Sequence, residues 1–190
     1  MKEIFKYFII GFLLIMIDLQ IPIDLLPDFI GYLYIYFGIK KLSSFLSSSQ
    51  NTRTAKILSL SLMIISIPTF VIDNTIQQSI NGYNYYLYVL AYIQILLIYY
   101  LFVLIIEFAQ RISHQSMLQT TKLLFKWYIS IMLISLLLQS FVINLPSGWQ
   151  IIVSFISVIS AFIMQIVLII YLAKMISRCP DKVNNCTFNA

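Results

Sequence analysis

Six long apolar stretches, separated by short polar segments, constrain the fold of this chain more than any other feature. They lie at about 7–26, 28–46, 55–73, 85–107, 123–145 and 149–173. A helix needs about 20 mainly apolar residues to cross the roughly 30 Å hydrocarbon core of a bilayer, and inside lipid its backbone groups must be satisfied within the segment. The pattern therefore predicts an all-α fold: a polytopic transmembrane bundle of six helices, with residues 1–190 forming a single integral membrane domain.

The composition supports a protein that lies in lipid. Of the 190 residues, 61% are apolar and 10% are charged, whereas a soluble domain carries about 25% charged residues. The net charge of +5 would favour a nucleic-acid partner in a soluble protein. Here the basic residues are scattered beside apolar segments, where they act as topology signals. We expect the lipid bilayer as the main partner and no nucleic acid.

Positive charges occur only in alternate connections. The 12 Lys and Arg residues lie before residue 7, in 40–56, in 107–126 and after 173, whereas 18–28, 73–84 and 145–149 contain none. Short loops that are rich in Lys and Arg stay in the cytoplasm. The alternation therefore predicts an even number of spans, with both the N-terminus and the C-terminus in the cytoplasm.

Aromatic residues gather near the predicted ends of several spans. Tyr83, Tyr85, Tyr86 and Tyr88 precede or open the fourth span, Trp149 opens the sixth, and Trp127 and Tyr128 follow Lys126 near the inner end of the fifth. Because Tyr and Trp are enriched at membrane–water interfaces, we interpret these residues as interfacial belts. For the tyrosines, the alternative is an aromatic cage that binds a quaternary ammonium ligand.

Small residues recur at helical spacing inside two spans. Gly31 and Gly38 are seven residues apart in the second span, and the sixth span carries Ser154, Ser157, Ser160 and Ala161. Faces of this kind let membrane helices approach each other closely. We expect both faces to pack against neighbouring helices.

The third span contains a candidate break. Ser66, Pro68 and Thr69 lie close together near its outer end. Proline removes a backbone donor and distorts a helix, so the sequence predicts a kink there.

Three glutamines lie within apolar sequence, at Gln94, Gln139 and Gln165. The first interpretation is that each amide forms hydrogen bonds between helices. The second is that the three line a polar pathway for a ligand.

Neither a nucleophile with its base nor a metal-ligand set is present, and Cys179 and Cys186 supply only two of the four ligands of a closed zinc site. We therefore expect no enzyme activity, no metal and no cofactor.

The most distinctive motif joins the first two spans and reads DLQIPIDLLPDFIG. With Lys6 at the inner boundary and a rise of 1.5 Å per residue, Asp18 lies about 18 Å along the first helix, inside the hydrocarbon. Pro22 obstructs the carbonyl of Asp18, which predicts that the first helix breaks between them. Pro27 suits the first turn of the second helix, and Asp28 suits its positive end.

Two interpretations of this motif remain open. It is either a tight hairpin in which the prolines mark the turn and the aspartates act as interfacial caps, or a functional pocket. Unpaired carboxylates at membrane depth are costly and mark ion, proton or substrate routes. In the functional interpretation, Asp18, Asp24 and Asp28 converge on an outward-facing pocket that binds a cation or a cationic small molecule.

The run IDLLPDFIGYL, followed by FGIKKL, also carries a resemblance. Both runs lie within residues 23–42, and they resemble the opening hairpin of a group of small, uncharacterised, multi-spanning membrane proteins of low-GC Gram-positive bacteria. The resemblance implies a multi-helix fold in a bacterial plasma membrane. It implies no particular activity.

Two hypotheses of function follow from the sequence. The first is a transport-related membrane protein with an acidic outward-facing pocket. The second is a non-catalytic accessory, immunity or scaffold protein that acts through helix–helix contacts with another membrane protein, or as a homo-oligomer.

Overall fold

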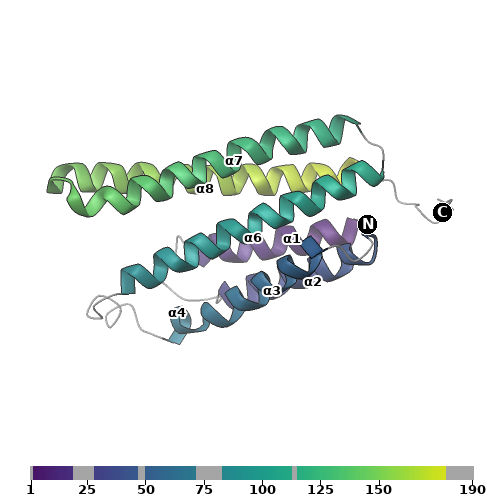
Figure 1. Ribbon diagram of the computed structural model, residues 1–190, viewed down its shortest axis with the longest axis horizontal. Coiled ribbons are helices and arrows are strands. Elements are labelled where there is room, and N and C mark those ends of the chain that lie inside the picture. Colours follow the sequence, from purple (N-terminus) through teal and green to yellow (C-terminus); the bar gives the residue numbers. More distant parts are fainter. Residues whose placement is uncertain (1, 19–27, 47–49, 72–82, 113–114, 179–190) are drawn as a thin grey trace.

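The computed structural model describes residues 2–18, 28–46, 50–71, 83–112 and 115–178, and all regular structure within these ranges is helical (Figure 1). Its long helices are α1 (Lys2–Asp18), α2 (Asp28–Ser43), α3 (Gln50–Ile65), α6 (Tyr83–Arg111), α7 (Gln115–Phe141) and α8 (Ser147–Arg178). A short helix, α4 (Ile67–Val71), follows α3, and a 3₁₀ turn, η1 (Val142–Asn144), follows α7. The predicted all-α fold is confirmed for the part of the chain that the structure describes.

Three helical segments are long and apolar enough to cross a membrane: Tyr85–Arg111, Gln115–Phe141 and Ser147–Ser177. They correspond to the fourth, fifth and sixth predicted spans and extend beyond them at most of their ends. By contrast, α1, α2 and α3 have 17, 16 and 16 residues, which gives them lengths of about 24–26 Å at 1.5 Å per residue. The count of six spans therefore stays a prediction.

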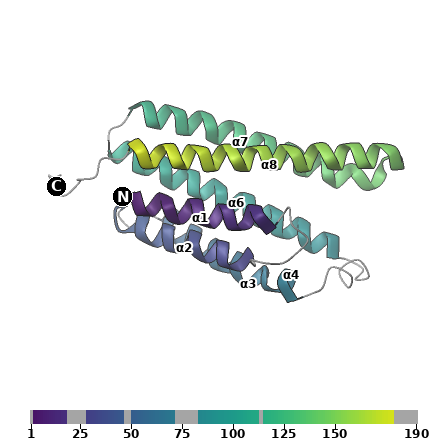
Figure 2. The same cartoon turned by 180° about the vertical axis from the view of Figure 1, so that it is seen from behind.

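The long helices run side by side and form a closed ring. Going round the ring, α1 packs against α2, α2 against α3, α3 against α6, α6 against α7, α7 against α8, and α8 against α1. Figures 1 and 2 show the bundle across its long axis from two opposite directions. The N-terminal end of α1 and the C-terminal end of α8 lie at the same end of the bundle. This end is called the basic end below.

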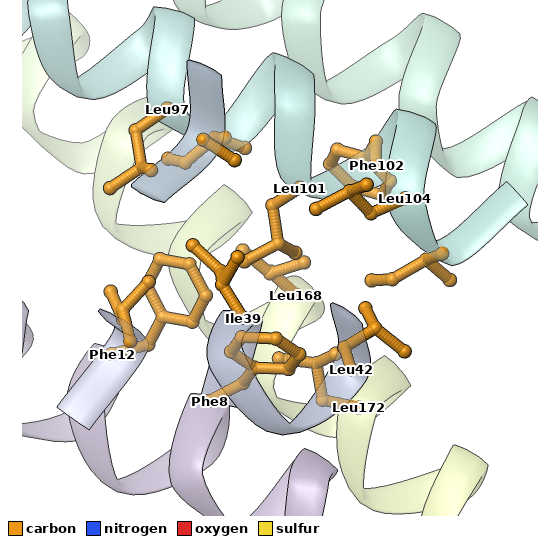
Figure 3. Packing of buried hydrophobic residues seen from close by; sticks show 14 of the residues in the cluster. Phe8, Phe12, Ile39, Leu42, Leu97, Leu101, Phe102, Leu104, Leu168 and Leu172 are labelled. Atoms are coloured by element: carbon orange, nitrogen blue, oxygen red, sulfur yellow. The ribbon is translucent and has the colours of Figure 1, made fainter. Parts of the chain in front are cut away.

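Apolar side chains from several helices fill the centre of the ring. Figure 3 shows residues of α1, α2, α6 and α8 converging there: Phe8, Phe12, Ile39, Leu42, Leu97, Leu101, Phe102, Leu104, Leu168 and Leu172. The ring of Phe5 meets that of Phe108 edge-on, with centroids 5.8 Å apart. Because lipid tails are as apolar as these side chains, close packing rather than escape from water stabilises this core in a membrane.

Glycine allows α1 and α2 to approach each other very closely. A Cβ atom added to Gly31 would lie 2.8 Å from the carbonyl oxygen of Gly11, and one added to Gly11 would lie 2.8 Å from the carbonyl oxygen of Gly31. At Gly38, an added Cβ would lie 2.6 Å from the ring of Phe8. The predicted packing face of Gly31 and Gly38 is confirmed, and its partner is α1.

The predicted kink in the third span is a full break between α3 and α4. Ser66 separates the two helices, and its amide still donates to the carbonyl of Leu62 over 2.8 Å. Pro68 lies in the first turn of α4, where its missing N–H costs little. The hydroxyl of Tyr86 on α6 donates to the carbonyl of Ile65, the last residue of α3. The break thus helps to attach α3 to α6.

Eleven of the 12 basic residues lie in described helices, since only Lys182 falls outside the described residues. Each of the eleven lies in the half of its helix nearer the basic end. Several tie helices together there: Lys41 donates to Glu3 over 2.7 Å, Lys56 to Ser43 over 2.9 Å, and Arg111 to the carbonyl of Phe45 over 3.0 Å. The hydrogen bond from Lys41 also lowers the pKa of the Glu3 carboxyl.

Candidate functional site

The predicted acidic pocket lies only partly within the described residues. In the described residues, α1 runs to Asp18 and α2 begins at Asp28, while the predicted break before Pro22 lies outside them. Asp24 and the side chain of Asp18 lie outside the described residues. Asp28 is half-buried, and its Oδ1 atom is buried from solvent. The convergence of the three carboxylates therefore stays a prediction.

The structure does establish how far along the bundle these helices end. Helix α1 has 17 residues and α8 has 32, which corresponds to about 25 Å and about 48 Å at 1.5 Å per residue. α1, α2 and α8 each have one end at the basic end of the bundle. The described residues of α1 and α2 therefore extend only partway along α6 and α8 (Figures 1 and 2). Asp18 and Asp28 therefore lie well below the far ends of the long helices.

A second polar feature follows the contact between α7 and α8. Three hydrogen-bonded pairs cross it: Thr121 with Tyr171, Tyr128 with Gln165, and Ser135 with Ser160. The Tyr128 hydroxyl donates to Gln165 Oε1 over 3.0 Å, and the two serine hydroxyls are 2.7 Å apart. We call these six residues the polar seam.

Gln165, in the middle pair of the polar seam, and Ser157, near it on α8, both bury polar atoms. Gln165 is 5% exposed, and while its Oε1 atom accepts from Tyr128, its Nε2 atom has no hydrogen-bond partner among the described residues. The hydroxyl of Ser157, on the predicted small-residue face, is likewise buried without a partner there. The predicted interhelical hydrogen bond of Gln165 is confirmed.

The three glutamines lie on three different helices. Gln94 on α6 and Gln139 on α7 are half-buried. Gln165 lies level with Tyr128, whereas Gln139 is eleven residues further along α7, which corresponds to about 16 Å. Near Gln139, the Tyr88 hydroxyl reaches the backbone carbonyl of Gln139 at 3.5 Å. A polar pathway lined by Gln94, Gln139 and Gln165 therefore stays a prediction.

The prediction for Tyr128 was wrong. The sequence placed it in an interfacial belt, but the structure buries it completely inside the helix bundle. The centroid of its aromatic ring lies 5.7 Å from that of Phe102. Its neighbour Trp127 is 60% exposed, as expected for a belt residue. The signal that could have found the polar seam is the heptad spacing of Thr121, Tyr128 and Ser135, which places all three on nearly the same face of α7.

No protein-family model matches the chain, and neither a curated protein nor a solved structure shows detectable similarity to it. The resemblance to small Gram-positive membrane proteins thus stays a prediction that rests on the hairpin sequence.

Proposed function

We propose that the chain is a six-span protein of a bacterial plasma membrane, with both termini in the cytoplasm. In this proposal it takes part in transport by binding a cation or a cationic small molecule at the acidic turn between α1 and α2. The observation that supports the proposal is the position of Asp18 and Asp28, the last described residue of α1 and the first residue of α2, which lie partway along α6 and α8.

Electrostatics favours a cation as the ligand. A carboxylate at membrane depth is costly unless it is protonated or neutralised by an opposite charge. The eleven basic residues of the described helices all lie toward the other end of the bundle. The N-terminus of α2 supplies about half a positive charge, which eases the charge of Asp28 and falls short of balancing three carboxylates. An external cation completes the balance.

The experiment compares purified wild-type protein with Asp18→Asn, Asp24→Asn and Asp28→Asn. Melting temperature is measured at constant ionic strength with Na⁺, K⁺, Mg²⁺, Ca²⁺ or a primary amine, against the bulky cation N-methylglucamine as reference. We expect at least one small cation to raise the melting temperature of the wild type, and the Asp variants to lose most of that increase.

The matched control is Glu3→Gln, which removes a carboxylate at the basic end. It should keep the full response to the cation, even if its own melting temperature falls. A wild type that melts alike in all cations, or Asp variants that respond as the wild type does, would contradict the proposal.

The second candidate function is that of an accessory protein that acts through helix contacts, and the outer surface of α7 and α8 favours it. This surface exposes many large apolar side chains, including those of Ile151 and Phe155. A photo-crosslinker at Phe155 tests it in cells. A discrete crosslinked species, together with no cation response in the melting assay, would favour the accessory function over transport.

A further inference from the structure

A half-open groove lies between α7 and α8 near the basic end. Its volume is about 490 Å³, which falls in the range of about 300–1,000 Å³ that is typical of small-molecule sites. Its walls are largely apolar and include Leu123 and Trp127 from α7 and Val167 and Ile170 from α8. A water-soluble polar ligand gains little from such walls, so the groove suits a hydrocarbon chain.

One end of the groove is polar. Among the described residues that line it, Lys174 is the one that carries a charge, and Thr120 and Tyr171 are its hydroxyl-bearing neighbours. Thr120 donates to the carbonyl of Ser116, and Tyr171 is paired with Thr121, so both hydroxyls are engaged within the protein. Lys174 is exposed. The ammonium group of Lys174 is therefore the group in the groove that can attract a charged ligand.

The ammonium and the apolar walls are spaced along the direction of the membrane normal. Lys174 follows the predicted end of the sixth span by one residue, and Val167 lies seven residues deeper on α8, or about 10 Å at 1.5 Å per residue. Trp127 is 60% exposed and lines the same groove. An amphipathic ligand with its charge at the interface and its chain pointing into the bilayer fits this arrangement.

The charged residues of α7 and α8 indicate the sign of the ligand's charge. Residues 115–178 contain Lys122, Lys126, Lys174 and Arg178, and they contain no Asp or Glu. All four basic residues lie in the halves of α7 and α8 nearer the basic end. The local field therefore attracts an anion, and basic pockets between helices on the cytoplasmic side bind anionic lipid headgroups.

We propose that this groove binds an anionic glycerophospholipid from the inner leaflet. Its phosphate lies at Lys174, and one acyl chain lies along Trp127, Val167 and Ile170. The inference rests on the cytoplasmic orientation of the basic end in the proposed function, and it is independent of cation binding at the acidic turn.

The test measures lipid binding to purified, delipidated protein by native mass spectrometry and by melting temperature. The probes are phosphatidylglycerol, phosphatidylcholine with the same acyl chains, and glycerol phosphate as the headgroup alone. We expect phosphatidylglycerol to bind more tightly and to raise the melting temperature most, while glycerol phosphate has little effect because it cannot use the apolar walls.

Two variants and one control separate headgroup from chain. Lys174→Gln should weaken phosphatidylglycerol binding about fivefold, the effect of about one lysine–phosphate interaction, and Lys174→Arg should restore it. Val167→Phe fills the apolar part of the groove and should weaken both lipids. The matched control, Lys122→Gln, removes a charge from the same pair of helices outside the groove and should weaken phosphatidylglycerol binding much less than Lys174→Gln does.

Equal binding of the two lipids, equal protection by glycerol phosphate, or equal losses in Lys174→Gln and Lys122→Gln would overturn the proposal. Failure of the proposed function is distinguishable from these results. Asp28→Asn should bind phosphatidylglycerol normally, and the assay in detergent does not depend on the response to cations.

Discussion

The contact of Gly11 with Gly31 fixes how closely α1 and α2 pack. Each glycine faces the backbone oxygen of the other, and Ile15 lies beside Gly31. Backbone atoms of packed helices cannot move aside as the end of a long side chain can. The sequence identified Gly31 through its spacing from Gly38, but it could not show that the opposing residue is Gly11, because that pairing depends on the register between two helices.

Gly31→Ala should therefore destabilise the protein. Its new Cβ atom would lie 2.7 Å from the Cγ1 atom of Ile15 and 2.8 Å from the carbonyl oxygen of Gly11, and overpacking of this kind costs about 1–3 kcal/mol. Thermal unfolding in detergent measures the loss. Gly148→Ala is the control, since an added Cβ there meets nothing within 4 Å. Equal melting temperatures for the two variants would show that α1 and α2 separate at little cost.

For whole helices, the sequence predicted where a helix breaks, but it did not predict which side of a helix faces the core. The break at Ser66 and Pro68 follows from the chemistry of proline in its own segment, so the sequence was sufficient. The burial of Tyr128 depends on which side of α7 meets its neighbours. Successive side chains of a helix point about 100° apart, so Trp127 is exposed on the outside of the bundle and Tyr128 is buried in its core although they are adjacent.

Two serines of α7 and α8 differ in burial. Ser157 on α8 is buried, whereas Ser130 on α7 is exposed. Ser157→Leu should lower the unfolding free energy by about 1–3 kcal/mol because the larger side chain overpacks a close helix contact. Ser130→Leu should change it by less than about 0.5 kcal/mol, as a surface substitution does. Thermal unfolding in detergent is the measurement, and similar losses at the two sites would remove the evidence for a packing role of this face.

Over the whole molecule, the distribution of basic residues and the number of packed helices both change along the length of the bundle. Basic residues concentrate at one end, and α1 and α2 end before the long helices do. In the orientation that the positive-inside rule predicts, Asp18 and Asp28 lie below the outer surface of the membrane. The charge alternation that predicts the orientation is visible in the sequence. The position of Asp18 along the bundle needed the structure, because it depends on how α1 is aligned with α8.

Cysteine accessibility in intact cells tests this orientation most directly. In a background with Cys179→Ser and Cys186→Ser, single cysteines are placed at Ser44, which follows α2, and at Ser147, which begins α8; both residues are exposed. An impermeant maleimide should label Ser147→Cys in intact cells and Ser44→Cys only after lysis. Labelling of Ser44→Cys before lysis, with Ser147→Cys protected, would contradict the orientation on which the acidic outer pocket depends.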